Sequence, residues 1–188
     1  MVPLPPPEER PIRAVGARRA RAGNPTTPTI IRTLRVIAKE SPALVALFDA
    51  QAVAGERHLL SAWAHLGRAR GRGETRLRDR GAEFALYVAG DDQLPRALAK
   101  VGVSDATEQF VLVTERSQDP TTLLGRFELT LDPSAYPRPV DEALLERLGI
   151  EAAERNVVPS SGWEGLVLER VALLELSAPA AHPPSQKH

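Results

Sequence analysis

The sequence predicts one domain in which helices pack around a buried sheet. The chain has 188 residues, of which 43% are apolar, and this is enough to bury a single core. Several segments carry apolar residues at helical spacing, and shorter runs between them are apolar throughout, as in strands covered on both faces. Strands and helices alternate along the chain, which leaves open whether the sheet is parallel or antiparallel.

Four apolar runs are predicted to be strands. Three of them are "IRAVGARRA" from Ile12, "ALVALFDA" from Ala43 and "QFVLVTE" from Gln109. In the fourth, "FALYVA" at residues 84–89, both alternating sets of side chains are apolar, which is typical of a strand with both faces covered. We therefore expect residues 84–89 to form a central strand.

Amphipathic periodicity predicts helices elsewhere in the chain. The segment "TTPTIIRTLRVIAKE" at residues 26–40 has Thr27 as its expected cap and Pro28 at the first helical position. Further helices, each with an apolar stripe, are predicted at residues 55–69, 140–149 and 163–176. Residues 119–129 are expected to form a short capped turn, and residues 131–139 a loop broken by prolines.

The junction after residues 84–89 contains a turn and the start of another helix. Gly90 can adopt a positive φ without steric strain, and Asp91 or Asp92 can cap a helix by accepting from free N–H groups. Pro95 suits a first helical turn, where no N–H donor is needed. A helix from about Gln93 to Val101 should follow.

Composition excludes several classes of site and protein. The chain has no cysteine, so it has no disulfide, no thiolate zinc site and no cysteine nucleophile. No apolar run approaches the roughly 20 residues of a membrane span, and the proline-rich start lacks the apolar segment of a signal peptide. We therefore expect a soluble cytoplasmic protein, with disordered tails at residues 1–11 and 177–188 around a domain at residues 12–176.

No catalytic constellation is predicted. His58 and His65 lie about two helical turns apart, whereas two ligands of one metal on a helix need a spacing of three or four residues. Asp91 and Asp92 are adjacent, but a carboxylate pair acting as acid and base needs opposed placement across a substrate. Phosphate-loop and nucleophile-elbow motifs are absent. A G-x-G-x-x-G fingerprint after a strand is absent too, since "GRARGRG" follows a helix and has the wrong spacing. We expect no catalytic activity, no cofactor and no metal.

An arginine-rich connector, residues 67–81, is the main charged feature of a chain whose formal net charge is zero. Its sequence "GRARGRGETRLRDRG" has two acidic residues, Glu74 and Asp79, and six arginines: Arg68, Arg70, Arg72, Arg76, Arg78 and Arg80. Guanidinium groups bind phosphates well, so the connector is a candidate nucleic-acid contact, with a solvated loop as the alternative. Aromatic residues are few and lie mostly in apolar runs, which disfavours stacking of several bases.

Three segments, in this order, resemble a known family. They are "LFDAQAVAGERHLLSAWAHLGRA", "FALYVAGDDQLPRALAKVGV" and "EGLVLERVALLEL". Together they are similar to the kinase-binding subunit of the KEOPS complex, the PRPK-binding protein (TPRKB) family, in its archaeal type. The resemblance covers roughly residues 12–176, and its most specific part is Gly90 followed by Gln93, Arg96 and Ala97.

The resemblance implies an α+β fold in a single domain, with helices packed against a mainly antiparallel sheet. It also implies a non-catalytic regulatory subunit that binds the atypical protein kinase of KEOPS and helps to recruit tRNA by its 3′ CCA end. The complex installs threonylcarbamoyladenosine in tRNA, and that chemistry belongs to the transferase subunit, which is an indirect partner. No cofactor and no membrane are implied.

The helix after Gly90 is then expected to act with the connector in binding RNA. Gln93, Arg96 and Lys100 are spaced three and four residues apart and share a helix face. We expect Gln93 to hydrogen-bond a base edge or ribose, and the two cations to neutralise phosphates. In the alternative, the Gln93 side chain caps the helix or bridges nearby backbone groups, and Arg96 pairs with Asp92 at i, i+4.

The expected kinase-binding surface lies on the C-terminal helices, which have more apolar positions than one sheet face covers. We expect Leu145, Leu148, Ile150 and Val167 in this surface, with ordinary core packing as the alternative. Two other functions stay open from the sequence. One is a stand-alone enzyme for a small acyl or phosphate substrate, using Asp91, Asp92 and His65, and the other is a purely structural adaptor.

Overall fold

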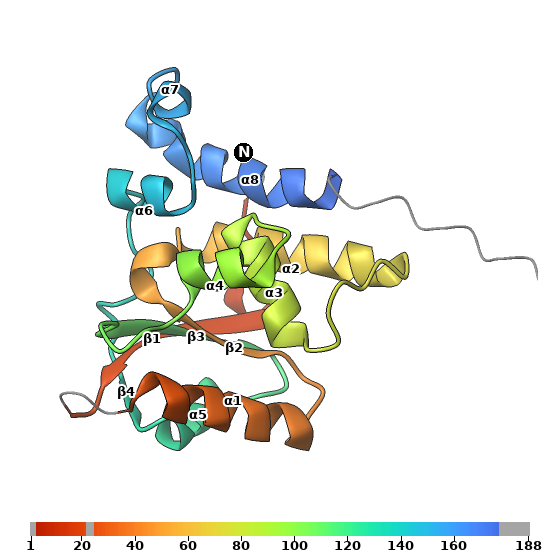
Figure 1. Ribbon diagram of the computed structural model, residues 1–188, viewed down its shortest axis with the longest axis vertical. Helices are drawn as coiled ribbons and strands as arrows, with labels where there is room; N and C mark the ends of the chain where they lie inside the picture. The colour runs from red at the N-terminus through yellow and green to blue at the C-terminus, as the bar shows by residue number, and fades with distance from the viewer. Residues whose placement is uncertain (1–2, 22–24, 177–188) are drawn as a thin grey trace, which may run out of the picture.

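The computed structural model describes residues 3–21 and 25–176, in which a four-stranded sheet has helices on both faces (Figure 1). The strands are β1 (Ile12–Arg19), β2 (Val45–Asp49), β3 (Gln109–Glu115) and β4 (Leu129–Leu131). They are arranged in the order β2-β3-β1-β4, and every neighbouring pair is antiparallel. This arrangement confirms the expected α+β fold.

Helices form a layer on each side of the sheet (Figure 1). One face is covered by α1 (Thr27–Glu40) and α5 (Pro120–Arg126), and the other by α2 (Glu56–Gly71), α3 (Arg80–Ala89) and α4 (Leu94–Val101). α8 (Trp163–Leu176) packs on α2 and α3. The short elements are η1 (Pro7–Glu9), η2 (Ala50–Ala52), α6 (Glu142–Arg147), α7 (Ala152–Arg155) and η3 (Ser160–Gly162). None of the helices in the described part of the chain has the length and apolarity needed to cross a bilayer.

The predicted strand at residues 84–89 is wrong, because these residues belong to α3. The helix begins after Asp79, whose Oδ1 accepts a hydrogen bond from the Ala82 N–H at 2.8 Å. It packs against β2, α2, α4 and α8, and every residue from Glu83 to Ala89 is buried. Because residues 84–89 are buried on every side of the helix, all of them are apolar, and this stretch looks like a strand with both faces covered.

The other long elements lie where the sequence predicts them. β1, β2 and β3 occupy the three remaining predicted strands, and α1, α2, α4 and α8 occupy the predicted amphipathic segments. The capped turn is also confirmed, since Asp119 accepts from the Thr121 and Thr122 N–H groups at the start of α5. β4 and α7 were not expected. β4 has only three residues, of which Leu129 alone is buried, so it has too little alternation to be recognised in sequence.

Gly90 ends α3 rather than a strand, and it has the expected positive φ, at 60°. Its N–H donates to the Tyr87 carbonyl, and the Asp91 N–H donates to the Leu86 carbonyl, which is the Schellman pattern of helix termination. A side chain here would also meet α8, because a Cβ would lie 3.2 Å from the Arg170 carbonyl oxygen. The position therefore favours glycine for two reasons, backbone conformation and space.

Gly90→Ala is expected to lower the free energy of unfolding by about 2 kcal/mol, because left-handed strain adds to the contact with α8. Urea unfolding measures the change. Gly67→Ala is the matched control, since an added Cβ in this part of α2 has no atom within 4 Å. This control should raise the free energy of unfolding by about 0.5 to 1 kcal/mol. Equal losses in both variants would contradict the explanation.

The N-terminal segment makes contacts within the range that was expected to be disordered. η1 lies at residues 7–9, Arg10 forms an ion pair with Glu56 of α2, and the Arg116 N–H donates to the Pro11 carbonyl. The domain as observed therefore begins before the predicted boundary at Ile12. The second predicted tail, residues 177–188, lies outside the described residues.

Candidate nucleic-acid interface

The arginine connector runs from the last turn of α2 to the first residue of α3. Gly73, with a φ of 77°, ends α2 in a second Schellman pattern, in which its N–H donates to the Arg70 carbonyl. Arg68, Arg70 and Arg72 are thereby fixed around one helical turn, and Arg80 opens α3. Residues 67–71 of the connector are therefore part of α2, and residues 80–81 are part of α3, so the connector is not simply a solvated loop.

A cluster around Glu175 joins the ends of α2 and α8. The Glu175 carboxylate pairs with His65, with Arg68 Nη2 at 3.1 Å and with Arg72 Nη1 at 2.7 Å. Burial opposes ionisation of Glu175, but hydrogen bonds from Arg68, Arg72 and His65 outweigh it and lower the pKa of Glu175 to about 2. The Arg68 and Arg72 side chains remain 50% and 45% exposed, so both stay accessible to a ligand.

Arg70 pairs with Glu83, a buried residue of α3 with 0% exposure. Arg70 Nε donates to one carboxylate oxygen of Glu83 at 2.6 Å, and the Arg76 backbone N–H donates to the other at 2.7 Å. Arg70 also donates to the Leu77 carbonyl at 3.0 Å. The buried carboxylate therefore attaches the connector to the protein interior.

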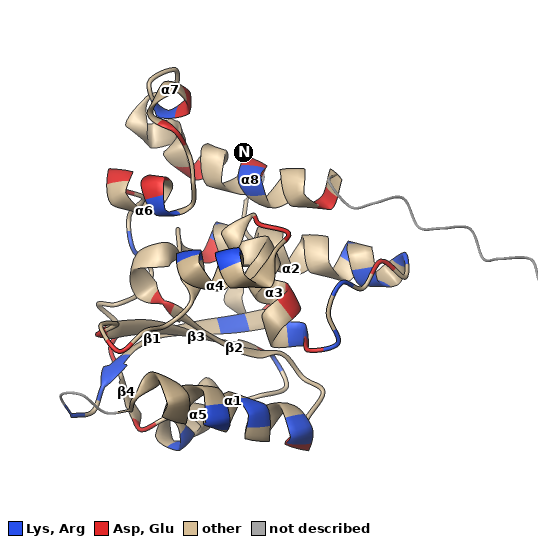
Figure 2. Ribbon diagram, viewed as in Figure 1, with Lys and Arg blue, Asp and Glu red and all other residues tan. Residues whose placement is uncertain are grey.

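The remaining connector arginines differ in their contacts. Arg76 donates to the Leu174 carbonyl of α8 at 3.0 Å. Arg80 lies over the Trp63 ring, 5.2 Å from its centroid, and pairs with Glu115 at 2.9 Å. Arg78 is exposed and has no hydrogen bond or ion pair to any other described residue. Basic residues gather at the side of the molecule where α2 ends and α3 begins (Figure 2).

A second charged cluster surrounds Asp91, between α3 and α4. The Asp91 carboxylate accepts from the Gln93 N–H at 3.0 Å and pairs with Arg96 at 3.0 Å and Lys100 at 3.1 Å. Burial opposes ionisation of Asp91, but the bonds from Gln93, Arg96 and Lys100 lower its pKa. The structure places Gln93, not Asp91 or Asp92, at the N-cap of α4, which corrects the predicted cap.

The three predicted RNA-binding residues of this helix are thus only partly available. Arg96 pairs with Asp92 at i, i+4 as well as with Asp91, which confirms the local alternative for its pairing, although its side chain is 57% exposed. Lys100 is 25% exposed. Gln93 is exposed, and its side-chain amide has no hydrogen bond among the described residues. Gln93 is therefore the polar group in this cluster with unused donors and acceptors.

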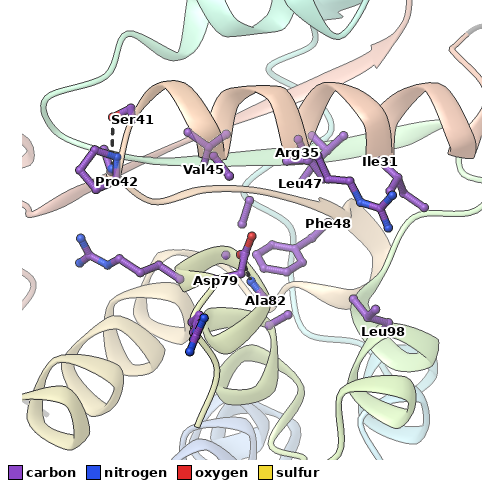
Figure 3. A pocket seen from close by; sticks show the side chains of 18 of the residues that line it. Ile31, Arg35, Ser41, Pro42, Val45, Leu47, Phe48, Asp79, Ala82 and Leu98 are labelled. Atoms are coloured by element: carbon purple, nitrogen blue, oxygen red, sulfur yellow. Dashed lines mark hydrogen bonds between the residues drawn. The ribbon is translucent and has the colours of Figure 1, made fainter. Parts of the chain in front are cut away.

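A groove of about 660 Å³ opens between α1 and the start of α3 (Figure 3). Ile31 and Arg35 of α1 line one wall, and Leu98 of α4 lies across from them. Its four arginines are Arg35, Arg70, Arg78 and Arg80. Three of these belong to the predicted connector set, but Arg35 was not predicted. No sequence signal marks Arg35, because the groove exists only where α1, β2 and the connector meet.

The residues of the alternative enzyme hypothesis have separate partners. His65 belongs to the Glu175 cluster at the end of α8, whereas Asp91 and Asp92 pair with Arg96. Within residues 3–21 and 25–176, no group of three or more histidine and acidic side chains is placed to bind a metal ion. No described contact joins His65 to either aspartate.

The expectation that the monomer leaves a C-terminal apolar surface uncovered at Leu145, Leu148, Ile150 and Val167 is wrong. These four side chains are 0%, 2%, 1% and 0% exposed, and all of them lie in the larger core. α2, α3 and α7 contact α8, which carries Val167, and η2 contacts α6, which carries Leu145. The four side chains cannot form a docking surface without rearrangement of the core.

Comparison with known proteins adds no assignment for this chain. A scan against protein-family models finds no matching family, and a search of curated proteins finds no significant match.

Proposed function

We propose that this chain is a non-catalytic subunit of a KEOPS-type tRNA-modifying complex, which binds the kinase subunit and recruits tRNA by its 3′ CCA end. Two features support the proposal: the sequence resemblance, and an antiparallel sheet covered by helices, which is the architecture that the resemblance implies. The observation that carries it is the pair of fixed, half-exposed arginines at the end of α2.

Arg68 and Arg72 are suited to an RNA backbone because their orientation is set before a phosphate binds. Each guanidinium group has five N–H donors. Arg68 uses Nε and Nη2 for Glu175 and His65, and Arg72 uses Nε and Nη2 for Glu74 and Nη1 for Glu175, so each arginine keeps N–H donors for a ligand. With Arg76 on the Leu174 carbonyl, the cluster has three arginines against two carboxylates, Glu74 and Glu175. A phosphate can therefore bind without displacing the internal ion pairs.

Gln93 is the group that we assign to recognition of the RNA end. Its exposed amide has both a donor and an acceptor, so it can hydrogen-bond an unpaired base, while Arg96 beside it can contact a phosphate. Because the four predicted kinase-binding residues are buried, we now place the kinase contact at exposed apolar side chains at the end of α8. Leu173 is 45% exposed and Leu176 is 80% exposed.

The two RNA-binding groups should have separable effects on tRNA affinity. Arg68→Ala with Arg72→Ala should weaken intact and CCA-trimmed tRNA equally, and the salt slope should fall by about 0.7 for each single-strand phosphate that is no longer neutralised. Gln93→Ala should leave the slope unchanged but reduce the preference for intact tRNA, by about 1 to 3 kcal/mol. Filter binding over a salt series measures both quantities, after gel filtration has tested co-elution with the cognate kinase.

Arg126→Ala is the matched control, because Arg126 pairs with Glu40 on the opposite face of the sheet. This variant should bind both tRNA forms as the unmodified protein does. An unchanged salt slope in the double arginine variant would exclude phosphate contacts at the end of α2. Failure of the unmodified protein to bind either the kinase or tRNA would contradict the proposed function as a whole.

A further inference from the structure

Within residues 3–21 and 25–176, no strand pairs with β2 on the side away from β3. β2 is the terminal strand in the order β2-β3-β1-β4, so one side of its backbone faces the groove between α1 and α3. Exposed strand edges present unpaired N–H and C=O groups and are sites where an extended peptide can add as a further strand. The groove walls would enclose such a peptide.

The ladder shows which β2 backbone groups point outward. The Glu115 N–H of β3 donates to the Leu44 carbonyl, so the alternation of an antiparallel pair turns the Val45 and Leu47 backbone away from β3. The position of α3 agrees, since a Cβ at Gly81 would lie 2.7 Å from the Val45 carbonyl oxygen. Among the described residues, none outside the sheet bonds to the Leu47 backbone. Leu47 therefore offers a donor and an acceptor to the groove.

Each wall of the groove combines one exposed apolar side chain with one arginine that pairs with no residue in the described part of the chain. On the α1 side these are Ile31, which is 41% exposed, and Arg35. On the side of α3 and α4 they are Leu98, which is 48% exposed, and Arg78. Side chains of an added strand would alternate between the two walls, so each wall would meet every second residue.

The charge of the groove selects the occupant. Arg70 and Arg80 also line it but are matched by Glu83 and Glu115. Arg35 and Arg78 have no ion pair with any described residue. Among the described residues of the lining, Asp79 is the acidic one, and its carboxylate accepts from the Ala82 N–H as the cap of α3. An acidic ligand is therefore favoured over a neutral or basic one.

We propose that this groove binds an extended acidic segment of a partner protein, which pairs with the β2 backbone at Leu47. Its aliphatic side chains contact Ile31 and Leu98, and its carboxylates pair with Arg35 and Arg78. This site is independent of RNA binding at Arg68, Arg72 and Gln93, so either proposal can fail without the other.

The probe is a blocked, fluorescein-labelled hexapeptide, Val-Val-Glu-Glu-Val-Val. Its sequence reads the same in both directions and gives each wall two valines and one glutamate, whichever way the strand runs. Fluorescence anisotropy should detect binding to the full chain. Arg35→Glu and Arg78→Glu should each weaken binding by about fivefold or more. NMR hydrogen exchange should show the Leu47 amide protected when the peptide is bound.

Three controls separate strand addition from simple charge attraction. Arg32→Glu makes the same charge change on α1, outside the groove lining, and should leave binding unchanged. A peptide with lysine in place of glutamate should bind only the Arg35→Glu, Arg78→Glu double variant. A peptide N-methylated at both glutamates, one of which must face β2, should not bind, because it cannot complete the backbone pairing.

The proposal is overturned if the N-methylated peptide binds as well as the parent, or if Arg32→Glu weakens binding as much as the groove variants do. It is also overturned if the hexapeptide does not bind at all. If the hexapeptide does not bind, but a single-stranded RNA ending in CCA binds the unmodified chain and loses affinity in the Arg35→Glu, Arg78→Glu variant, the groove is assigned to RNA instead.

Discussion

Replacing Glu83 with alanine should lower the free energy of unfolding by about 3 kcal/mol. The substitution leaves Arg70 without the carboxylate to which it donates at 2.6 Å, and it leaves the Arg76 N–H without its acceptor at 2.7 Å. Glu83 has 0% exposure, so water cannot easily replace the missing oxygens. Urea unfolding at pH 7 measures the loss, and circular dichroism verifies that the variant is folded before denaturant is added.

Two further variants test whether the pair itself is responsible. Glu83→Gln keeps an acceptor for the Arg76 N–H but removes the charge that Arg70 needs, so its loss should be smaller than that of Glu83→Ala. Arg70→Met combined with Glu83→Leu removes both charges and should recover part of the stability. Glu169→Ala, at an exposed position of α8, should change the free energy of unfolding by no more than about 0.5 kcal/mol. A loss for Glu83→Ala as small as this control would contradict the assignment.

Glu83 also shows why α3 was not predicted. A glutamate inside an apolar run normally marks a solvent-facing position, but here it is covered by the connector that its own carboxylate holds. The helices α1, α2 and α8 and the strands β1 to β3 were predictable because each has either an apolar stripe at helical spacing or the length of a buried strand. In α3 the residues from Phe84 to Ala89 are all apolar and buried, so this stretch has no polar position to mark it as helical.

The candidate site was predictable in composition but not in pairing. Local ion pairs, such as Arg96 with Asp92, follow from helical spacing, and the sequence suggested this one. Arg68 and Glu175 lie 107 residues apart, and Arg70 and Glu83 meet only because α2 and α3 pack together. The sequence therefore identified the arginines, but not their partners. How many N–H donors each arginine keeps for a ligand depends on contacts that only the fold determines.

The apolar stripes of the C-terminal helices illustrate the same limit. A stripe shows that a helix buries one face, but it does not show whether the covering element belongs to the chain or to a partner. For Val167 and Leu145 the cover is internal. The groove at β2 could not be recognised in the sequence either. Its lining residues lie in α1, β2, the connector, α3 and α4, and only the fold brings these segments together.

The free energy of unfolding should fall by about 3 kcal/mol as the pH is lowered from about 6.5 to about 4, because His58 is buried in its neutral form. Burial lowers the pKa of His58 to about 4, although the bond to the Val88 carbonyl opposes this shift. Nε2 donates to that carbonyl at 2.8 Å, and Nδ1 accepts from the Ala54 N–H at 3.1 Å, so a proton on Nδ1 would face another donor.

The sign follows from the proton balance between the two states. Between pH 6.5 and pH 4 the unfolded chain binds a proton at His58 that the folded protein does not, so stability is complete above pH 6.5 and is lost as the pH falls. Glu175, with a pKa of about 2, adds its own loss only below its ordinary value of 4.5. Urea unfolding between pH 7 and pH 5 therefore isolates the histidine, and about 2 kcal/mol of the predicted loss falls in this window.

Substitution of each histidine on α2 assigns the effect. His58→Gln cannot titrate, so this variant should be less stable at pH 7 but should lose most of the pH dependence between pH 7 and pH 5. His65→Gln should keep that dependence, because His65 lies in the partly exposed Glu175 cluster. An NMR titration of the unmodified protein provides a test that does not require a stable variant. If the His58 ring resonances shift with a midpoint near pH 6.5 while the protein stays folded, burial does not suppress its protonation and the predicted loss of stability is wrong.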